Sequence, residues 1–202
     1  AAWYIPLPHF CATHTIVAQV EALKSMVNDF SDYARSPRAE PEPFEFDQLI
    51  AEVAELYRGG RADLRVQLNS QHAMLKGDPK RLRQVLHNLL KNANEAIEDR
   101  ENARIVISTR RLEDLEAPLI ELRVADNGSG IDPQLLERLF EPYVTSKTRG
   151  TGLGLAIVKK IIEEHGGIIT AENLEEGAVF TAHLPLWHGV VDSPATPEQT
   201  TG

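Results

Sequence analysis

Two short glycine-rich segments, each leading into a helix-like pattern, constrain this chain more than any other feature. Residues 126–131 read DNGSGI, and residues 150–155 read GTGLGL. Glycine adopts positive φ and lets the main chain approach a ligand closely. A helix that begins just after such a turn presents free N–H groups and the positive end of its dipole to phosphate. The pair therefore predicts a nucleotide that is held by backbone groups.

The bulk properties narrow the class of protein. A chain of 202 residues can hold one well-buried domain plus appendages. The formal net charge of −9 argues against nucleic-acid binding, because no basic patch offsets it. One cysteine, Cys11, excludes an intrachain disulfide and fits a reducing compartment. No apolar run approaches the roughly 20 residues that cross a bilayer. We expect a cytoplasmic chain, which could be part of a longer, membrane-anchored sensor.

Composition shifts divide the chain into segments. Residues 1–11 have no period and are interpreted as an irregular lead-in. The interval 12–36 carries apolar residues at heptad spacing, which predicts a helix that packs along a partner helix; they are Ile16, Val20, Leu23, Val27 and Phe30. Prolines in 37–43 predict a linker. Residues 44–185 form the predicted main domain, and the Pro- and Thr-rich interval 186–202 is predicted to be a disordered tail.

Hydrophobic periodicity predicts the elements of the main domain. We expect helices at about 47–58, 78–99, 133–138 and 152–165, with Asp47 and Asp78 as N-caps. Strands are expected at 64–69, 72–76, 104–111, 119–125, 168–173 and 178–184. The helices and strands do not alternate strictly. The pattern therefore favours an α+β fold, a two-layer α/β sandwich with helices on one face of a mixed sheet.

Three polar residues lie along one edge of the predicted helix at 78–99. Asn88, Asn92 and Glu95 are spaced i, i+4 and i+7. Their oxygens suit a hard cation such as Mg²⁺, although a solvated helix edge is the alternative. Gly154 falls inside an otherwise good helix pattern, where it costs about 1 kcal/mol relative to alanine. Together with Asp126 and both glycine segments, these residues favour a nucleotide site.

Four segments resemble, in order and with the expected gaps, the N, G1, F and G2 boxes of sensor histidine kinases. They are NLLKNANEA (88–96), DNGSGI (126–131), LFEPY (139–143) and GTGLGL (150–155). The resemblance covers about residues 44–185, and the run FEPYVTSKTRGTGLGLAIVKKIIEEHGG is especially similar to nitrogen-regulation sensor kinases of the NtrY type. It implies the GHKL ATP-binding sandwich, preceded by the second helix of a dimerisation hairpin.

The resemblance also implies roles for individual residues. Asn92 becomes the Mg²⁺ ligand with Asn88 beside it, and Asp126 becomes the acceptor for the adenine amine. Residues from about 128 to 152 become a mobile lid over ATP, with Phe140 in its hinge region. The further residues expected to bind the nucleotide are Glu95, Gly128, Gly130, Ile131, Lys147, Arg149, Gly150, Thr151, Gly152, Leu153, Gly154 and Leu155.

The implied activity is transfer of the ATP γ-phosphoryl group to a histidine, for relay to an aspartate of a response-regulator receiver domain. Asn88 stands where hydrolytic relatives carry a glutamate, and an amide cannot accept the proton of an attacking water. The family's acceptor motif is absent, since neither His9 nor His14 matches it. We therefore expect a fragment that binds Mg-ATP or ADP without autophosphorylating, from a protein that dimerises through its helices.

The sequence is also compatible with other functions. A non-catalytic nucleotide-binding module and a serine-directed GHKL kinase both fit the four boxes. The heptad segment favours the histidine kinase over the serine-directed relatives, which generally lack it. A gyrase-like or MutL-like ATPase is disfavoured by Asn88 and by the absence of a transducer domain.

Overall fold

A computed structural model of the chain describes residues 20, 23–24, 27, 31, 41–113, 117–147 and 150–189. The main helices are α2 (Phe46–Glu55), α3 (Pro79–Ala96), α4 (Pro133–Leu136) and α5 (Gly154–Glu164). The strands are β1 (Glu42–Glu45), β2 (Asp63–Asn69), β3 (Met74–Gly77), β4 (Arg104–Leu112), β5 (Leu119–Asp126), β6 (Ile168–Asn173) and β7 (Ala178–Pro185).

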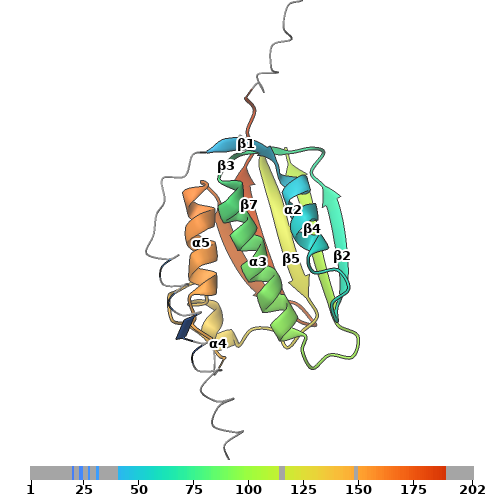
Figure 1. Ribbon diagram of the computed structural model, residues 1–202, viewed down its shortest axis with the longest axis vertical. Helices are drawn as coiled ribbons and strands as arrows, with labels where there is room; N and C mark the ends of the chain where they lie inside the picture. The colour runs from blue at the N-terminus through green and yellow to red at the C-terminus, as the bar shows by residue number, and fades with distance from the viewer. Residues whose placement is uncertain are drawn as a thin grey trace, which may run out of the picture.

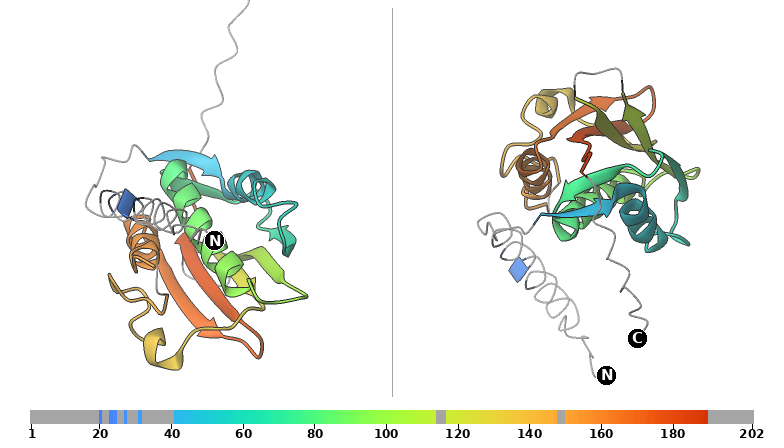
Figure 2. Two further views of the ribbon diagram at one scale, coloured as in Figure 1. Left: turned by 60° about the horizontal axis from the view of Figure 1, so that its bottom comes forward. Right: turned by 90° about the horizontal axis from the view of Figure 1, so that it is seen from above.

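Five strands form the main sheet in the order β2-β4-β5-β7-β6, and β1 pairs with β3 in a separate two-stranded sheet. β2 and β4 are parallel and the other neighbours are antiparallel, so the sheet is mixed. Helices α2, α3 and α5 lie side by side over one face of it (Figure 1), and the view from above in Figure 2 separates the two layers. The predicted α+β sandwich is confirmed.

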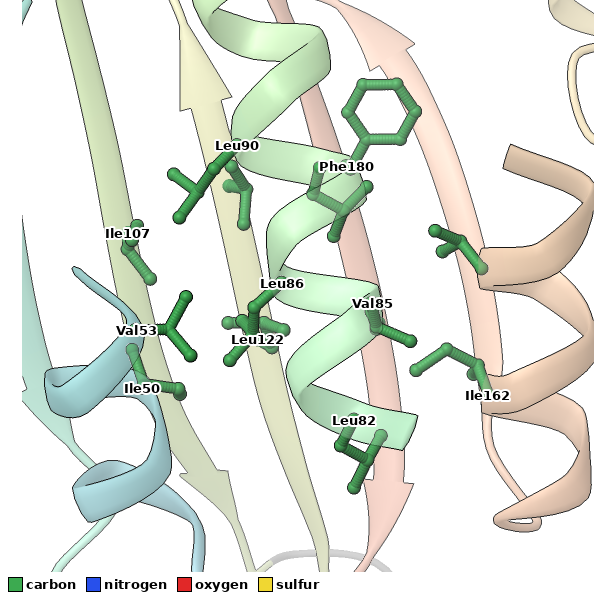
Figure 3. Packing of buried hydrophobic residues seen from close by; sticks show 14 of the residues in the cluster. Ile50, Val53, Leu82, Val85, Leu86, Leu90, Ile107, Leu122, Ile162 and Phe180 are labelled. Carbon is green, nitrogen blue, oxygen red and sulfur yellow. The ribbon is translucent and has the colours of Figure 1, made fainter. Parts of the chain in front are cut away.

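The core lies between the helices and the sheet. Strand alternation turns Ile120, Leu122 and Val124 of β5 toward the helices, where they are fully buried. Helix α3 runs between α2 and α5; Val85 points toward Ile162 of α5, and Leu86 lies over β5 (Figure 3). This central helix carries the polar row at Asn88, Asn92 and Glu95, so packing fixes the direction in which that row faces.

The helix α2 starts differently from the sequence prediction. Its N-cap position is Glu45, which makes no side-chain cap, and the predicted N-cap Asp47 lies in the first turn. The Asp47 carboxylate instead accepts hydrogen bonds from Thr109 Oγ1 (2.8 Å) and from the Ser70 backbone N–H (3.3 Å). The prediction was wrong because partners on and beside the sheet, distant in sequence, take the carboxylate.

The structure also places two segment boundaries differently from the sequence prediction. β1 begins at Glu42, inside the interval expected to be a linker, with Pro43 on an edge strand where a missing N–H is tolerated. Leu186 N–H donates to Pro118 O (3.1 Å) and Trp187 N–H to Met74 O (2.8 Å). The first residues of the expected tail are therefore held on the domain. The intervals 1–19 and 190–202 lie outside the described residues.

Helix α3 begins as predicted, with Asp78 as its N-cap. The carboxylate accepts from the backbone N–H groups of Lys80 (2.9 Å) and Arg81 (3.3 Å). An Asp78→Ala substitution is expected to lower the free energy of unfolding by about 1 kcal/mol, measured by urea denaturation. Asp63→Ala, which removes only an exposed pairing with Arg65, is the control and is expected to change it by less than about 0.5 kcal/mol. Equal losses would contradict the capping role.

Within the described ranges, no helix has the length and apolar character needed to cross a membrane.

Candidate functional site

A cleft of about 760 Å³ opens beside α3. Its walls come from α3, the end of β5, the segment 129–152, the start of α5 and strand β7. Residues as far apart in the sequence as Asn88 and Phe180 thus meet at one cavity. Among the sequence-predicted site residues, the cleft is lined by Asn88, Asn92, Glu95, Asp126, Gly130, Ile131, Lys147, Gly150, Thr151, Gly152, Gly154 and Leu155.

Three predicted residues lie behind the cleft wall rather than on it. Gly128 donates its N–H to Asp126 Oδ1 (2.8 Å), and an added Cβ there would lie 2.5 Å from the Ala96 carbonyl oxygen. Phe140 packs edge-on against Phe180, with ring centroids 6.4 Å apart. Leu153 is buried in the core. These residues support the wall instead of forming it. Arg149 lies outside the described residues.

Asp126 is a buried carboxylate at the end of β5, with 6% of its surface exposed. Burial raises its pKa, against hydrogen bonds from the backbone of Gly128 and Ala178 that lower it. The folded protein therefore binds a proton here more readily than the unfolded chain. The resulting cost in stability is present at neutral pH and is relieved as the pH falls through the raised pKa. A carboxylate kept in a cleft at such a cost is a strong candidate for ligand binding.

The polar row of α3 faces the segment before the second glycine turn. Lys147 Nζ donates to Asn92 Oδ1 (3.3 Å) and forms an ion pair with the Glu95 carboxylate. Two oxygens of α3 thus converge on one cationic group. This donor set suits a hard cation, and Mg²⁺ commonly takes only one or two protein ligands and completes its shell with phosphate and water. No group of three or more His, Cys, Asp or Glu residues suited to a metal was found in the part of the chain that the structure describes.

Asn88 connects α3 to the second glycine segment. Its Nδ2 donates to Gly154 O (3.5 Å), at the first residue of α5. The sequence placed Gly154 inside a helix that starts at about residue 152, and this was wrong: α5 starts at Gly154. The free-energy cost of a glycine inside a helix therefore does not arise at Gly154. The open N-terminal turn of an eleven-residue helix instead lies against the cleft, and such a turn attracts anions.

Both glycine segments contain a residue that uses positive φ. Gly130 has φ +74° and Gly152 has φ +67°. A Cβ on Gly152 would lie 2.6 Å from the carbonyl carbon of Tyr143, whose N–H donates to Gly152 O (3.0 Å). Tyr143 itself has φ +68°, which is uncommon for a non-glycine residue. The two chain segments therefore meet backbone to backbone at the edge of the cleft.

Several lining residues were missed from the sequence. Ala178 and Phe180 of β7 contribute from the sheet, but alternation marks them only as core positions. Leu135, Leu139 and Val144 add apolar side chains from the connecting segment. The remaining unpredicted residues lie within the motifs or close to them in sequence, which could have suggested them: Lys91, Ala96, Glu98, Ser129, Asp132, Thr145 and Ser146.

Comparison with known proteins gives a consistent result. Residues 77–188 match the family model described as histidine kinase-, DNA gyrase B- and HSP90-like ATPase. The nitrogen regulation protein NtrY of Azorhizobium caulinodans is 40% identical over 181 residues, which is 86% of this chain and 23% of that protein. The sensory histidine kinase/phosphatase NtrB of Rhizobium meliloti is 32% identical over 92% of this chain and 52% of that protein. The chain thus spans about a quarter to a half of these relatives.

Solved structures agree with the sequence relatives. The nucleotide-free catalytic domain of histidine kinase ThkA superimposes with a TM-score of 0.63 at 38% identity, covering 72% of this chain and 97% of that domain. ThkA in complex with the response regulator protein TrrA gives a TM-score of 0.71 at 31% identity, over 91% of this chain and 53% of that one.

Proposed function

Because this chain belongs to the sensor histidine kinases, within the histidine kinase-, DNA gyrase B- and HSP90-like ATPases, we propose that its cleft binds ATP and presents the γ-phosphoryl group to a histidine of a dimerisation helix. One observation carries the proposal. The cleft holds a buried acceptor, Asp126, and a separate row of amide and carboxylate oxygens on α3 beside a lysine. A nucleoside triphosphate needs both kinds of group, one set for its base and one for its phosphates.

At the base end, the Asp126 carboxylate accepts a hydrogen bond from the exocyclic amine of adenine. Burial favours this contact, because an acceptor shielded from water gains more from a partner than one that water already satisfies. Ile131 and Phe180 contribute apolar surface to the same cleft. Apolar walls with a small number of placed polar groups are typical of sites that bind a nucleotide base.

At the phosphate end, the Asn92 carboxamide oxygen would hold Mg²⁺, which would neutralise phosphate charge. The contact that Lys147 makes with Asn92 and Glu95 supports this, since these oxygens already face a cation. Lys147 and Arg149 would pair with phosphate oxygens, and the open N-terminal turn of α5 at Gly154 and Leu155 would attract them. Phosphoryl transfer depends mainly on this kind of positioning and charge stabilisation.

Asn88 favours transfer over hydrolysis. A carboxamide has no basic lone pair for the proton of an attacking water. Without a general base, bound ATP persists until a stronger nucleophile, the histidine imidazole, arrives. Asn88 is in addition hydrogen-bonded to Gly154 O, which orients its amide toward the start of α5.

The proposal extends to the dimer and to the response-regulator partner. Residues 12–36 form the second helix of a dimerisation hairpin, and Val20, Leu23 and Val27 of its heptad pattern are 59–64% exposed. A second copy of the protein covers them, and the domain from β1 to Trp187 is the catalytic domain. The phosphoryl group then passes to a response-regulator receiver domain; the relative ThkA forms a complex with a partner of this kind, the response regulator protein TrrA. The domain works in the cytoplasm.

Titration and labelling with γ-labelled ATP test the proposal. We expect the chain to bind ATP and ADP and to remain unlabelled, because its histidines do not lie in the family's acceptor motif. Adding the dimerisation helices of a related kinase, with its own ATP site inactivated, is expected to yield acid-labile label on their histidine. Acid-stable label would indicate a serine-directed kinase. Binding without transfer to any acceptor would indicate a non-catalytic module, and no binding would refute the proposal.

A further inference from the structure

The side chain of Asn173 forms a two-way hydrogen-bonded pair with the backbone of Ile131. Asn173 Oδ1 accepts from Ile131 N–H (2.7 Å), and Nδ2 donates to Ile131 O (2.7 Å). A carboxamide offers the same donor and acceptor as a peptide group. The pair therefore reproduces one rung of a β-ladder, and a single side chain satisfies both backbone polar groups of Ile131.

The clamped residue belongs to the cleft, whereas Asn173 does not line it. Gly130, Ile131 and Asp132 are all lining residues, in a segment between β5 and α4 that has no ladder or helix of its own. Asn173 is the last residue of β6, at the edge of the main sheet. The carboxamide thus ties an irregular part of the cleft wall to a regular strand.

Glycine is required where the two segments approach. A Cβ on Gly130 would lie 3.1 Å from Asn173 Oδ1, and its φ of +74° already disfavours other residues. The turn after β6 closes with a bond from Leu174 N–H to Gly177 O (3.0 Å). A Cβ on Gly177 would overlap the Asp126 carbonyl oxygen. The β6–β7 turn therefore packs against the segment 126–131 at both of its ends.

We propose that Asn173 is a positioning residue for nucleotide binding, holding Ile131 in place beside Asp126 at the base end of the cleft. The proposal rests on the ATP-binding function in that it takes ATP as the ligand. Fixing this segment before binding removes an ordering cost that the ligand would otherwise have to offset. Because the clamp acts at the base end, it affects ATP, ADP and adenosine alike, whereas a phosphate contact would discriminate among them.

Two substitutions test the clamp. Asn173→Ala removes both hydrogen bonds, and Asn173→Asp keeps the acceptor but places an oxygen against Ile131 O. Asn173→Ala is expected to weaken ATP and ADP binding by about tenfold, within the range for two lost neutral hydrogen bonds, with the ATP-to-ADP ratio unchanged. Asn173→Asp loses the bond to Ile131 O and sets two oxygens against each other, so it is expected to weaken both affinities in the same ratio. Glu172→Ala, at the neighbouring exposed position of β6, is the matched control and is expected to leave both affinities unchanged.

Amide hydrogen exchange of Ile131, followed by NMR without nucleotide, reports the clamp independently of the ligand. Exchange is expected to accelerate in Asn173→Ala, which removes the acceptor of the Ile131 N–H, and to stay slow in the wild type and in Glu172→Ala. Unchanged exchange would refute the clamp. Faster exchange with unaltered ATP affinity would refute its role in binding, as would a change confined to ATP. A wild type that binds no ATP would refute the proposed function, while the exchange data would still decide whether Ile131 is held.

Discussion

Replacing Asp126 with asparagine is expected to weaken ATP binding by at least about a hundredfold, measured by isothermal titration calorimetry. The reason lies in the hydrogen bonds that already fix the carboxylate. The Gly128 N–H donates to Oδ1 (2.8 Å), and the Ala178 backbone also donates to the carboxylate. An asparagine is therefore expected to keep its oxygen at the Oδ1 position, opposite the Gly128 N–H. Its NH₂ group is then left toward the cleft, where it meets the adenine amine donor to donor.

Glu121→Gln is the matched control. Glu121 is on the same strand β5 and is 7% exposed, but it pairs with Arg110 (3.2 Å) and His183 (3.3 Å) and does not line the cleft. We expect its substitution to leave ATP affinity unchanged. Equal weakening in both variants would mean that the effect arises from the strand as a whole. Unaltered affinity in Asp126→Asn would show that the adenine assignment is wrong.

The same carboxylate gives wild-type binding a pH dependence. Its pKa is raised by burial, so on acidification it takes up a proton at a higher pH than an exposed aspartate does. ATP affinity is therefore expected to fall as the pH decreases through the raised pKa, and to be constant well above it. Glu121→Gln should show the same profile as the wild type. A constant affinity down to about pH 4, near the ordinary aspartate value, would contradict this.

A Gly152→Ala substitution is expected to weaken ATP binding by at least about tenfold and to lower the free energy of unfolding by about 2 kcal/mol. The new Cβ would lie 2.6 Å and 2.7 Å from the carbonyl carbon and Cα of Tyr143. These are backbone atoms, so no rotamer change relieves the overlap. The second glycine segment must shift, and it carries five cleft residues: Gly150, Thr151, Gly152, Gly154 and Leu155.

Gly59→Ala separates backbone strain from overlap in this prediction. Gly59 also has positive φ, +78°, yet its added Cβ would meet nothing within 4 Å. Its substitution is expected to cost about 1 kcal/mol through strain alone and to leave ATP affinity unchanged. Both quantities are obtained from urea denaturation and calorimetric titration. If the two variants behave alike, the contact with Tyr143 is not what positions the segment.

Features with a local cause were accessible from the sequence. Asp78-Pro79 begins α3 because a short carboxylate can reach the N–H groups two and three residues on. The spacing of Asn88, Asn92 and Glu95 predicts one helix edge, and all three line the cleft. Strand alternation likewise predicted the bounds of β4, β5, β6 and β7 to within one or two residues. The order of the strands in the sheet did not follow from these patterns, since pairing depends on contacts across the whole domain.

Asp47 and Gly154 show why other predictions from short sequence patterns were wrong. Asp47 has the sequence context of an N-cap, but Thr109, 62 residues away, takes its carboxylate. Gly154 fits a helix interior, but the tight contact between Gly152 and Tyr143 holds the preceding residues in a turn and delays the start of α5. At Asp47 a distant partner outweighed a capping preference of about 1 kcal/mol.

The sequence by itself determined the class of the domain and the ligand chemistry, because glycine turns, helix spacing and the four boxes are local patterns. Only the tertiary structure decided which groups complete the cleft: Phe180 from β7, the contact of Lys147 with α3, and the Asn173 clamp on Ile131, 42 residues away. No regular interval in the sequence links these residues to their partners. Folding alone brings them together, because burial of the α3 and β5 core fixes the distances between the segments that carry them.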